Sequence, residues 1–135
     1  MALTKVGSHP SHGGQVVFNA TASFTLDPSD SGKIFILKDA AITVTLPTLS
    51  TNLAGFQITL ISGDDSEHIV TGGDSKIYGH SIDASGTVAE TVLPLTGHST
   101  ITPAAGIAIG DKFEITSDGT NWYMFCVTGV QVVGS

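Results

Sequence analysis

The sequence predicts an all-β protein, an antiparallel β-sandwich of jelly-roll-like form with about nine to ten short strands and no significant helix. Three observations support this fold class. Small polar residues are abundant, with 17 Thr, 14 Ser and 16 Gly, whereas charged residues make up only 13% of the chain. Runs of strand-forming residues recur at a spacing of roughly eight to twelve residues, separated by turn residues. No segment repeats its apolar residues at helical spacing over two or more turns.

Apolar and polar residues that alternate, or short apolar runs between turn residues, place the individual strands. In the clearest case Ile42, Val44 and Leu46 point inward and the threonines between them point outward, before Pro47 ends the strand. Strand-like runs lie, in chain order, within residues 15–26, 33–37, 41–46, 56–61, 67–71, 75–79, 87–95, 99–102, 111–117, 120–127 and 130–133. The runs at 75–79 and 99–102 are the weakest of these, so the expected number of strands is about nine to ten.

The two strands around Asp118 and Gly119 form the most distinctive stretch. That dipeptide favours a two-residue type I′ hairpin turn, in which Ile115 faces Trp122 and Phe113 faces Met124. The first strand alternates cleanly, but the second is apolar on both faces. A strand of this kind is covered on both faces. The second cover is either the rest of this chain or another chain, and the sequence leaves both open.

Length and composition indicate one domain, at residues 15–135, preceded by an extended arm at residues 1–14. The arm contains His9 and His12, which lie three residues apart. Because Pro10 and Gly13 flank them, they cannot share one face of a stable helix. We therefore expect no metal site there, and instead an arm that lies on a neighbouring subunit.

The charge pattern argues against several partner classes. The net charge is −7 and all five basic residues are lysines. An acidic chain without arginine is a poor candidate for binding nucleic acid or an anionic membrane. The first residues carry no apolar signal region, so we expect synthesis in a cytoplasm, with assembly there.

No motif predicts catalysis or a cofactor. The acidic cluster Asp64, Asp65, Glu67 and His68 lacks the spacing and the glycine of an EF-hand, so we expect a solvated turn. His80 and Ser81 are adjacent, and neighbouring strand residues point to opposite faces, so they should not meet. Cys126 is the single cysteine and should be a buried, inert thiol. We predict no catalytic, cofactor-binding or metal-binding residues, and no enzyme activity.

Four short segments occur in an order that resembles small virion proteins of tailed bacteriophages. These segments are 30–33 (DSGK), 44–47 (VTLP), 55–58 (GFQI) and 117–122 (SDGTNW). The family includes capsid decoration (cement) proteins and domains of tail fibres and spikes. The resemblance implies a β-sandwich or jelly-roll-like unit, usually a homotrimer, with a binding role. The chain differs from fibre proteins in being short, without a shaft or coiled coil.

From the resemblance we expect a capsid decoration protein on the virion surface, made in the host cytoplasm. It would bind the major capsid protein on the outside of the head as a homotrimer and stabilise the shell. The alternative is a tail, fibre or baseplate module that binds a host receptor glycan. Trp122, Tyr123 and Phe125, with His9 and His12 of the arm, are the expected subunit or shell interface.

Overall fold

The computed structural model describes residues 3–8, 16–83, 92–103, 108–128 and 132–134, and these contain thirteen β-strands. The strands are β1 (Leu3–Ser8), β2 (Val16–Ala20), β3 (Phe24–Thr25), β4 (Ile34–Leu37), β5 (Thr43–Thr45), β6 (Gln57–Ser62), β7 (Ile69–Thr71), β8 (Ile77–Asp83), β9 (Val92–His98), β10 (Thr100–Pro103), β11 (Lys112–Ser117), β12 (Trp122–Thr128) and β13 (Val132–Gly134). In these residues helical structure is limited to the 3₁₀ turns η2 (Pro28–Asp30) and η3 (Thr51–Leu53). The expected all-β class is confirmed, with more strands than the expected nine to ten.

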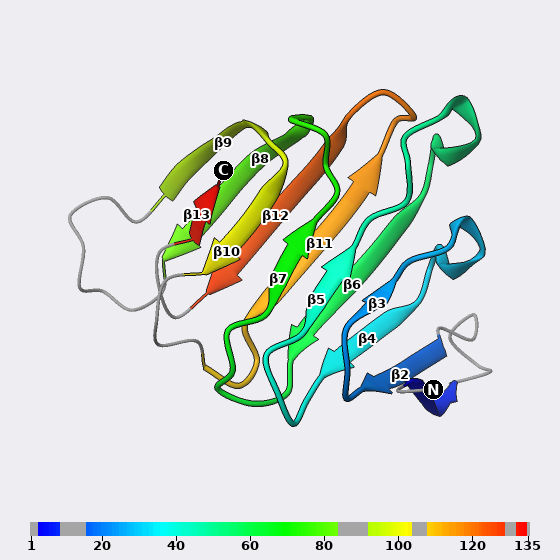
Figure 1. Ribbon diagram of the computed structural model, residues 1–135, viewed down its shortest axis with the longest axis vertical. Helices are drawn as coiled ribbons and strands as arrows, with labels where there is room; N and C mark the ends of the chain where they lie inside the picture. Colours follow the sequence, from blue (N-terminus) through cyan, green and yellow to red (C-terminus); the bar gives the residue numbers. More distant parts are fainter. Residues whose placement is uncertain (1–2, 9–15, 84–91, 104–107, 129–131, 135) are drawn as a thin grey trace.

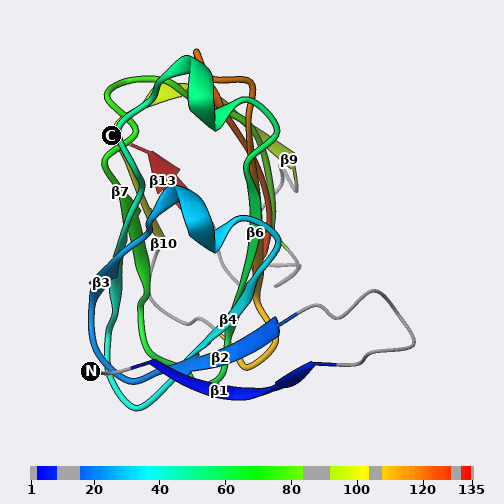
Figure 2. The same ribbon diagram turned by 90° about the vertical axis from the view of Figure 1, so that its right-hand side faces the viewer.

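Two sheets form the molecule. One has eight strands in the order β1-β2-β4-β6-β11-β12-β8-β9, and the other has five in the order β13-β10-β7-β5-β3. The sheets face each other as two layers (Figures 1 and 2). Their facing residues form one hydrophobic cluster, to which the larger sheet contributes Phe35, Leu60 and Phe113 and the smaller sheet Val44 and Val70. Two layers packed around one hydrophobic core are the usual architecture of a protein domain.

The first half of the domain alternates between the layers. From β2 to β8 each strand lies in the opposite sheet from the strand before it. Successive strands within a sheet therefore run in the same direction. The parallel pairs are β2–β4, β4–β6, β3–β5, β5–β7 and β8–β12, and the other six pairs are antiparallel. The expectation of antiparallel pairing throughout is wrong, because the sheets are mixed, and the strand order does not confirm a jelly roll.

The hairpin of β11 and β12 is inserted between β6 and β8 in the larger sheet (Figure 1). Its register differs by two residues from the expected one, because Ile115 faces Met124 and Ser117 faces Trp122. The loop thus has four residues rather than two. The Asp118 carboxylate explains this, since its Oδ1 accepts hydrogen bonds from the backbone amides of Thr120 and Asn121 at 2.8 and 2.7 Å. This Asx-type turn competes with the type I′ turn that Asp-Gly alone favours.

The described part of the expected arm is a strand of the larger sheet. β1 pairs antiparallel with β2 at the sheet edge, with a bulge between Lys5 and Gly7. Leu3 packs against the core. Residues 9–14 of the arm, which include His9 and His12, lie outside the described residues. The division into arm and domain stays a prediction.

Candidate interaction surface

β12 has one buried face and one exposed face, although both are apolar. Trp122, Met124 and Cys126 are 0%, 2% and 0% exposed. On the opposite face the exposed fractions of Tyr123 and Phe125 are 43% and 44%. Within the described residues no part of this chain covers that outer face. The inner face is therefore covered by the core. The sequence left open whether the rest of this chain or another chain covers the second face, and the described part of this chain does not cover it.

The exposed face continues onto the two neighbouring strands. Tyr123 is paired with Tyr78 of β8, and Phe125 is paired with His80 of β8, which in turn faces Pro94 of β9. We use the name apolar face for the outward side of β12, β8 and β9. Its members are Tyr78, His80, Ile82, Val92, Pro94, Tyr123, Phe125 and Val127.

Close backbone approach holds the strands of the apolar face together. Gly79 has φ +136°, and a Cβ built at this position would lie 1.9 Å from the Met124 carbonyl oxygen. Only glycine allows β8 and β12 to approach this closely. The Tyr123 hydroxyl donates to Asp118 Oδ2 at 3.0 Å, which ties this ring to the hairpin loop. Hydrogen bonds from Asn121 and Thr120 amides lower the pKa of Asp118, so the carboxylate that accepts from Tyr123 is charged. The apolar face is thus built on constrained strands.

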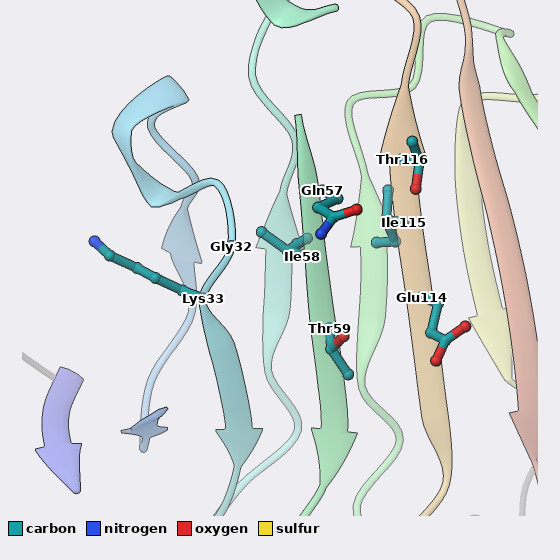
Figure 3. A pocket seen from close by; sticks show the side chains of 8 residues that line it. All are labelled: Gly32, Lys33, Gln57, Ile58, Thr59, Glu114, Ile115 and Thr116. Carbon is teal, nitrogen blue, oxygen red and sulfur yellow. The ribbon is translucent and has the colours of Figure 1, made fainter. Parts of the chain in front are cut away.

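A polar hollow lies beside the apolar face on the same side of the larger sheet. Its volume is about 240 Å³, and Gln57 and Thr59 of β6 line it opposite Glu114 and Thr116 of β11 (Figure 3). Lys33 borders the hollow from the start of β4, with its side chain extending away from β6. The outer side of this sheet is therefore divided into a polar half and an apolar half.

Charges in the polar half are paired with each other. Lys112 Nζ lies 2.8 Å from Glu114 Oε1, and Lys33 Nζ lies close to Asp30 Oδ1 at 2.6 Å. Lys33 Nζ is also 5.1 Å from the centroid of the Phe18 ring. In these two pairs the charges offset each other, so contacts made with the described residues around the hollow would be mainly hydrogen-bonded or apolar.

The residues selected from the sequence are distributed over different parts of the molecule. Tyr123 and Phe125 lie on the apolar face, whereas Trp122 lies in the core, where its ring packs edge-on against Phe56 at 5.6 Å. Trp122 therefore presents no surface to a partner. The sequence did not identify Tyr78, which is brought beside Tyr123 by the parallel β8–β12 pair. Long-range pairing of this kind leaves no local signal in the sequence.

The predictions for the histidine, serine and cysteine side chains have different outcomes. His80 is exposed and Ser81 is buried, so these neighbours do point to opposite faces. Cys126 is buried as expected, and burial raises the pKa of its thiol, which keeps it protonated and unreactive. The prediction that His68 belongs to a solvated turn is wrong, because only 1% of its surface is exposed. Among the described residues no cluster of three or more His, Cys, Asp or Glu side chains is placed to hold a metal ion.

Comparison with known proteins assigns no family to this chain. No protein-family model matches it, and neither a curated protein nor a solved structure shows a significant match. No helix among the described residues has the length and apolar character needed to cross a membrane.

Proposed function

We propose that this chain is a structural assembly protein, a decoration protein that binds the outside of a tailed-bacteriophage head as a trimer. The observation that carries the proposal is the apolar face, on which Tyr78, Tyr123 and Phe125 are each about two-fifths exposed. A contiguous exposed apolar patch is typical of a surface that binds another protein. The virion assignment itself rests on the resemblance of the sequence segments, and the two facing sheets are consistent with a β-sandwich module.

In this proposal the apolar face is the seam between protomers. Aromatic residues are enriched in interface cores and charged residues are depleted there. The members of the apolar face fit this description, since none of them is Asp, Glu, Lys or Arg. Each buried Å² of apolar area would contribute about 25 cal/mol, less the cost of association. The remaining surface of each protomer would be available for the major capsid protein.

The first test is the oligomeric state of the full chain and of Phe125→Asp. We expect the wild type to have the light-scattering mass of a trimer. A charge at the centre of the apolar face should give a folded monomer, because the carboxylate would be buried without a partner at the seam. Thr25→Asp is the matched control, since Thr25 is exposed on the smaller sheet and the variant carries the same added charge.

Several outcomes of this test would contradict the proposal. A wild-type monomer without affinity for phage heads would exclude a decoration trimer. Loss of the trimer in Thr25→Asp as well would exclude a seam specific to the apolar face. Electron microscopy of the virion provides the independent test of location, because the proposal requires density on the outer surface of the head.

A second candidate is a tail, fibre or baseplate module that binds a receptor glycan. The polar hollow favours it, because amide, hydroxyl and carboxylate groups of Gln57, Thr59, Glu114 and Thr116 lie next to the exposed rings of Tyr123 and Phe125. Ligand sites combine apolar walls with a few polar groups in this way. Binding of the purified chain to host polysaccharide, with loss in Gln57→Ala and no binding to heads, would favour this candidate over decoration.

A further inference from the structure

The chain contains a buried histidine that joins the two sheets at one end of the core. His68 directly precedes β7, and Ile42 directly precedes β5, its parallel neighbour in the smaller sheet. The Ile42 amide donates to His68 Nδ1 at 3.2 Å, and the Ile69 amide donates to the Ile42 carbonyl at 2.8 Å. The His68 side chain therefore extends the β5–β7 ladder by one hydrogen bond ahead of the first residues of the two strands.

The other ring nitrogen of His68 contacts the turn that follows β6 of the larger sheet. His68 Nε2 lies 3.1 Å from Asp64 Oδ1, and the same oxygen accepts from the Ser66 amide at 2.9 Å. The turn is attached to the larger sheet, since Ser62 Oγ donates to the Asp64 carbonyl at 2.7 Å and the Gly63 amide donates to the Leu37 carbonyl at 2.7 Å. Through His68, the end of the eight-stranded sheet is bonded to the end of the five-stranded sheet.

This geometry allows only one form of the ring. A backbone amide always donates, so Nδ1 must carry a lone pair, and the single proton of the neutral ring is on Nε2 and is donated to Asp64. A proton added to Nδ1 would face the Ile42 amide, donor against donor, in a site with 1% exposure. The protonated ring would keep its contact with Asp64 but lose its contact with the β5–β7 ladder.

We propose that His68 is an acid-sensitive pin, which holds the β6–β7 turn against β5 when neutral and releases the Ile42 amide when protonated. Release would loosen the end of the core at which β5 and β7 begin. His68 is not a member of the apolar face. It does not depend on the decoration proposal.

The surrounding charges define the pH range of this release. Burial lowers the pKa of His68 below its ordinary value of 6.5, and Asp64 opposes this. Partial burial would raise the pKa of Asp64, but hydrogen bonds from the Ser66 and Asp39 amides and the His68 charge outweigh it and hold the pKa below 3.8. The remaining titratable groups on the two segments that meet here are Asp65 and Glu67 on the β6–β7 turn and Lys38 and Asp39 after β4.

The direction of the pH dependence follows from the lowered pKa of His68 in the folded chain. Unfolded chains take up a proton at His68 near pH 6.5, whereas folded chains take it up only at lower pH. Stability from the neutral pin is therefore complete above pH 6.5 and is lost as pH falls from 6.5 through the folded-state pKa. In this window the unfolding constant should rise by up to about tenfold per pH unit because of this one group.

The test compares the full-length wild type with His68→Asn. The Asn side-chain oxygen can accept from the Ile42 amide in place of Nδ1, but it does not titrate. We expect urea unfolding between about pH 7.5 and pH 5 to show the added pH dependence in the wild type and not in His68→Asn. His98→Asn, which removes a partly exposed histidine of β9 outside the apolar face, is the matched control and should retain the wild-type slope. Equal slopes in wild type and His68→Asn would overturn the proposal.

A second measurement applies even if His68→Asn does not fold. Nitrogen-15 chemical shifts of the His68 ring in the wild type should report the neutral Nε2–H form at about pH 7. As the pH falls below 6.5, the change in this signal and the loss of hydrogen-exchange protection at the Ile42 amide should follow one titration curve. The proposal would be overturned by a ring that is charged at about pH 7 or by a neutral ring in the Nδ1–H form. It would also be overturned if the hydrogen-exchange protection of the Ile42 amide did not change as His68 titrates.

Discussion

The two faces of β12 have nearly the same chemistry and opposite surroundings. Trp122 and Met124 on the inner face are almost fully buried, whereas Tyr123 and Phe125 on the outer face are more than two-fifths exposed. Both faces are flanked by the same two strands, β11 and β8. The difference shows that apolar character alone does not identify the core. The opposing sheet covers the inner face, while the outer face is available for a partner.

The outer sides of the two sheets differ in their chemistry instead. Thr45 of β5, Thr71 of β7 and Thr100 of β10 form a row across the smaller sheet, with the Thr71 and Thr100 hydroxyls 2.8 Å apart. Threonine on a solvent-facing sheet needs no partner. The aromatic residues on the larger sheet leave apolar area in water instead. In the proposed function, the binding surface is therefore the outer side of the larger sheet.

The largest expected effect comes from the inner face. Trp122→Ala should destabilise the folded chain by about 3–5 kcal/mol, because it removes the bulk of a fully buried ring and leaves a cavity beside Phe56. Urea unfolding monitored by far-ultraviolet circular dichroism measures the loss. A change of less than about 1 kcal/mol would mean that the inner face is not the core that the structure places there.

The next effect tests how the two faces are held. Gly79→Ala should cost on the order of 3 kcal/mol, because the new methyl group would collide with the Met124 carbonyl and the residue would be held at φ +136°. β8 must then separate from β12, which would also disrupt the apolar face. Gly32→Ala is the control, since Gly32 has φ +86° but open space around the position of its Cβ. Equal losses in the two variants would indicate backbone strain alone and would contradict a close approach.

Local patterns in the sequence predicted the strands better than their partners. In β11 the expected inward positions Phe113 and Ile115 are both 1% exposed, and Ile42, Val44 and Leu46 are also buried as expected. Alternation and strand boundaries depend on neighbouring residues, so they can be recognised in the sequence. Parallel pairing depends on connections that cross between sheets, and the alternating residues look the same in parallel and antiparallel strands.

Two errors at the level of single residues have side-chain causes. The Asp118 carboxylate binds two loop amides and lengthens the hairpin loop, which shifts the register by two residues but keeps each residue on its expected face. His68 was expected in solvent because Asp64, Asp65 and Glu67 precede it. Its burial depends on the Ile42 amide, 26 positions away, and this contact has no signature near His68. Of the candidate site, Tyr123 and Phe125 could be found from the hairpin, but Tyr78 and Pro94 required the sheet order.

The smallest expected effect on folding comes from the outer face and sharpens the comparison most. Tyr123→Ala removes a side chain that is 43% exposed and whose hydroxyl bonds only the loop residues Asp118 and Asn121 among the contacts described. The folded monomer should lose about 1 kcal/mol or less. If the apolar face is a seam, wild-type stability should rise with protein concentration, because association favours the folded state, and this rise should disappear in Tyr123→Ala. Trp122→Ala should instead lower stability at every concentration. If the unfolding midpoint of the wild type does not depend on protein concentration, the apolar face is not a seam between copies of this chain. Its remaining candidate partners would then be the capsid or a glycan.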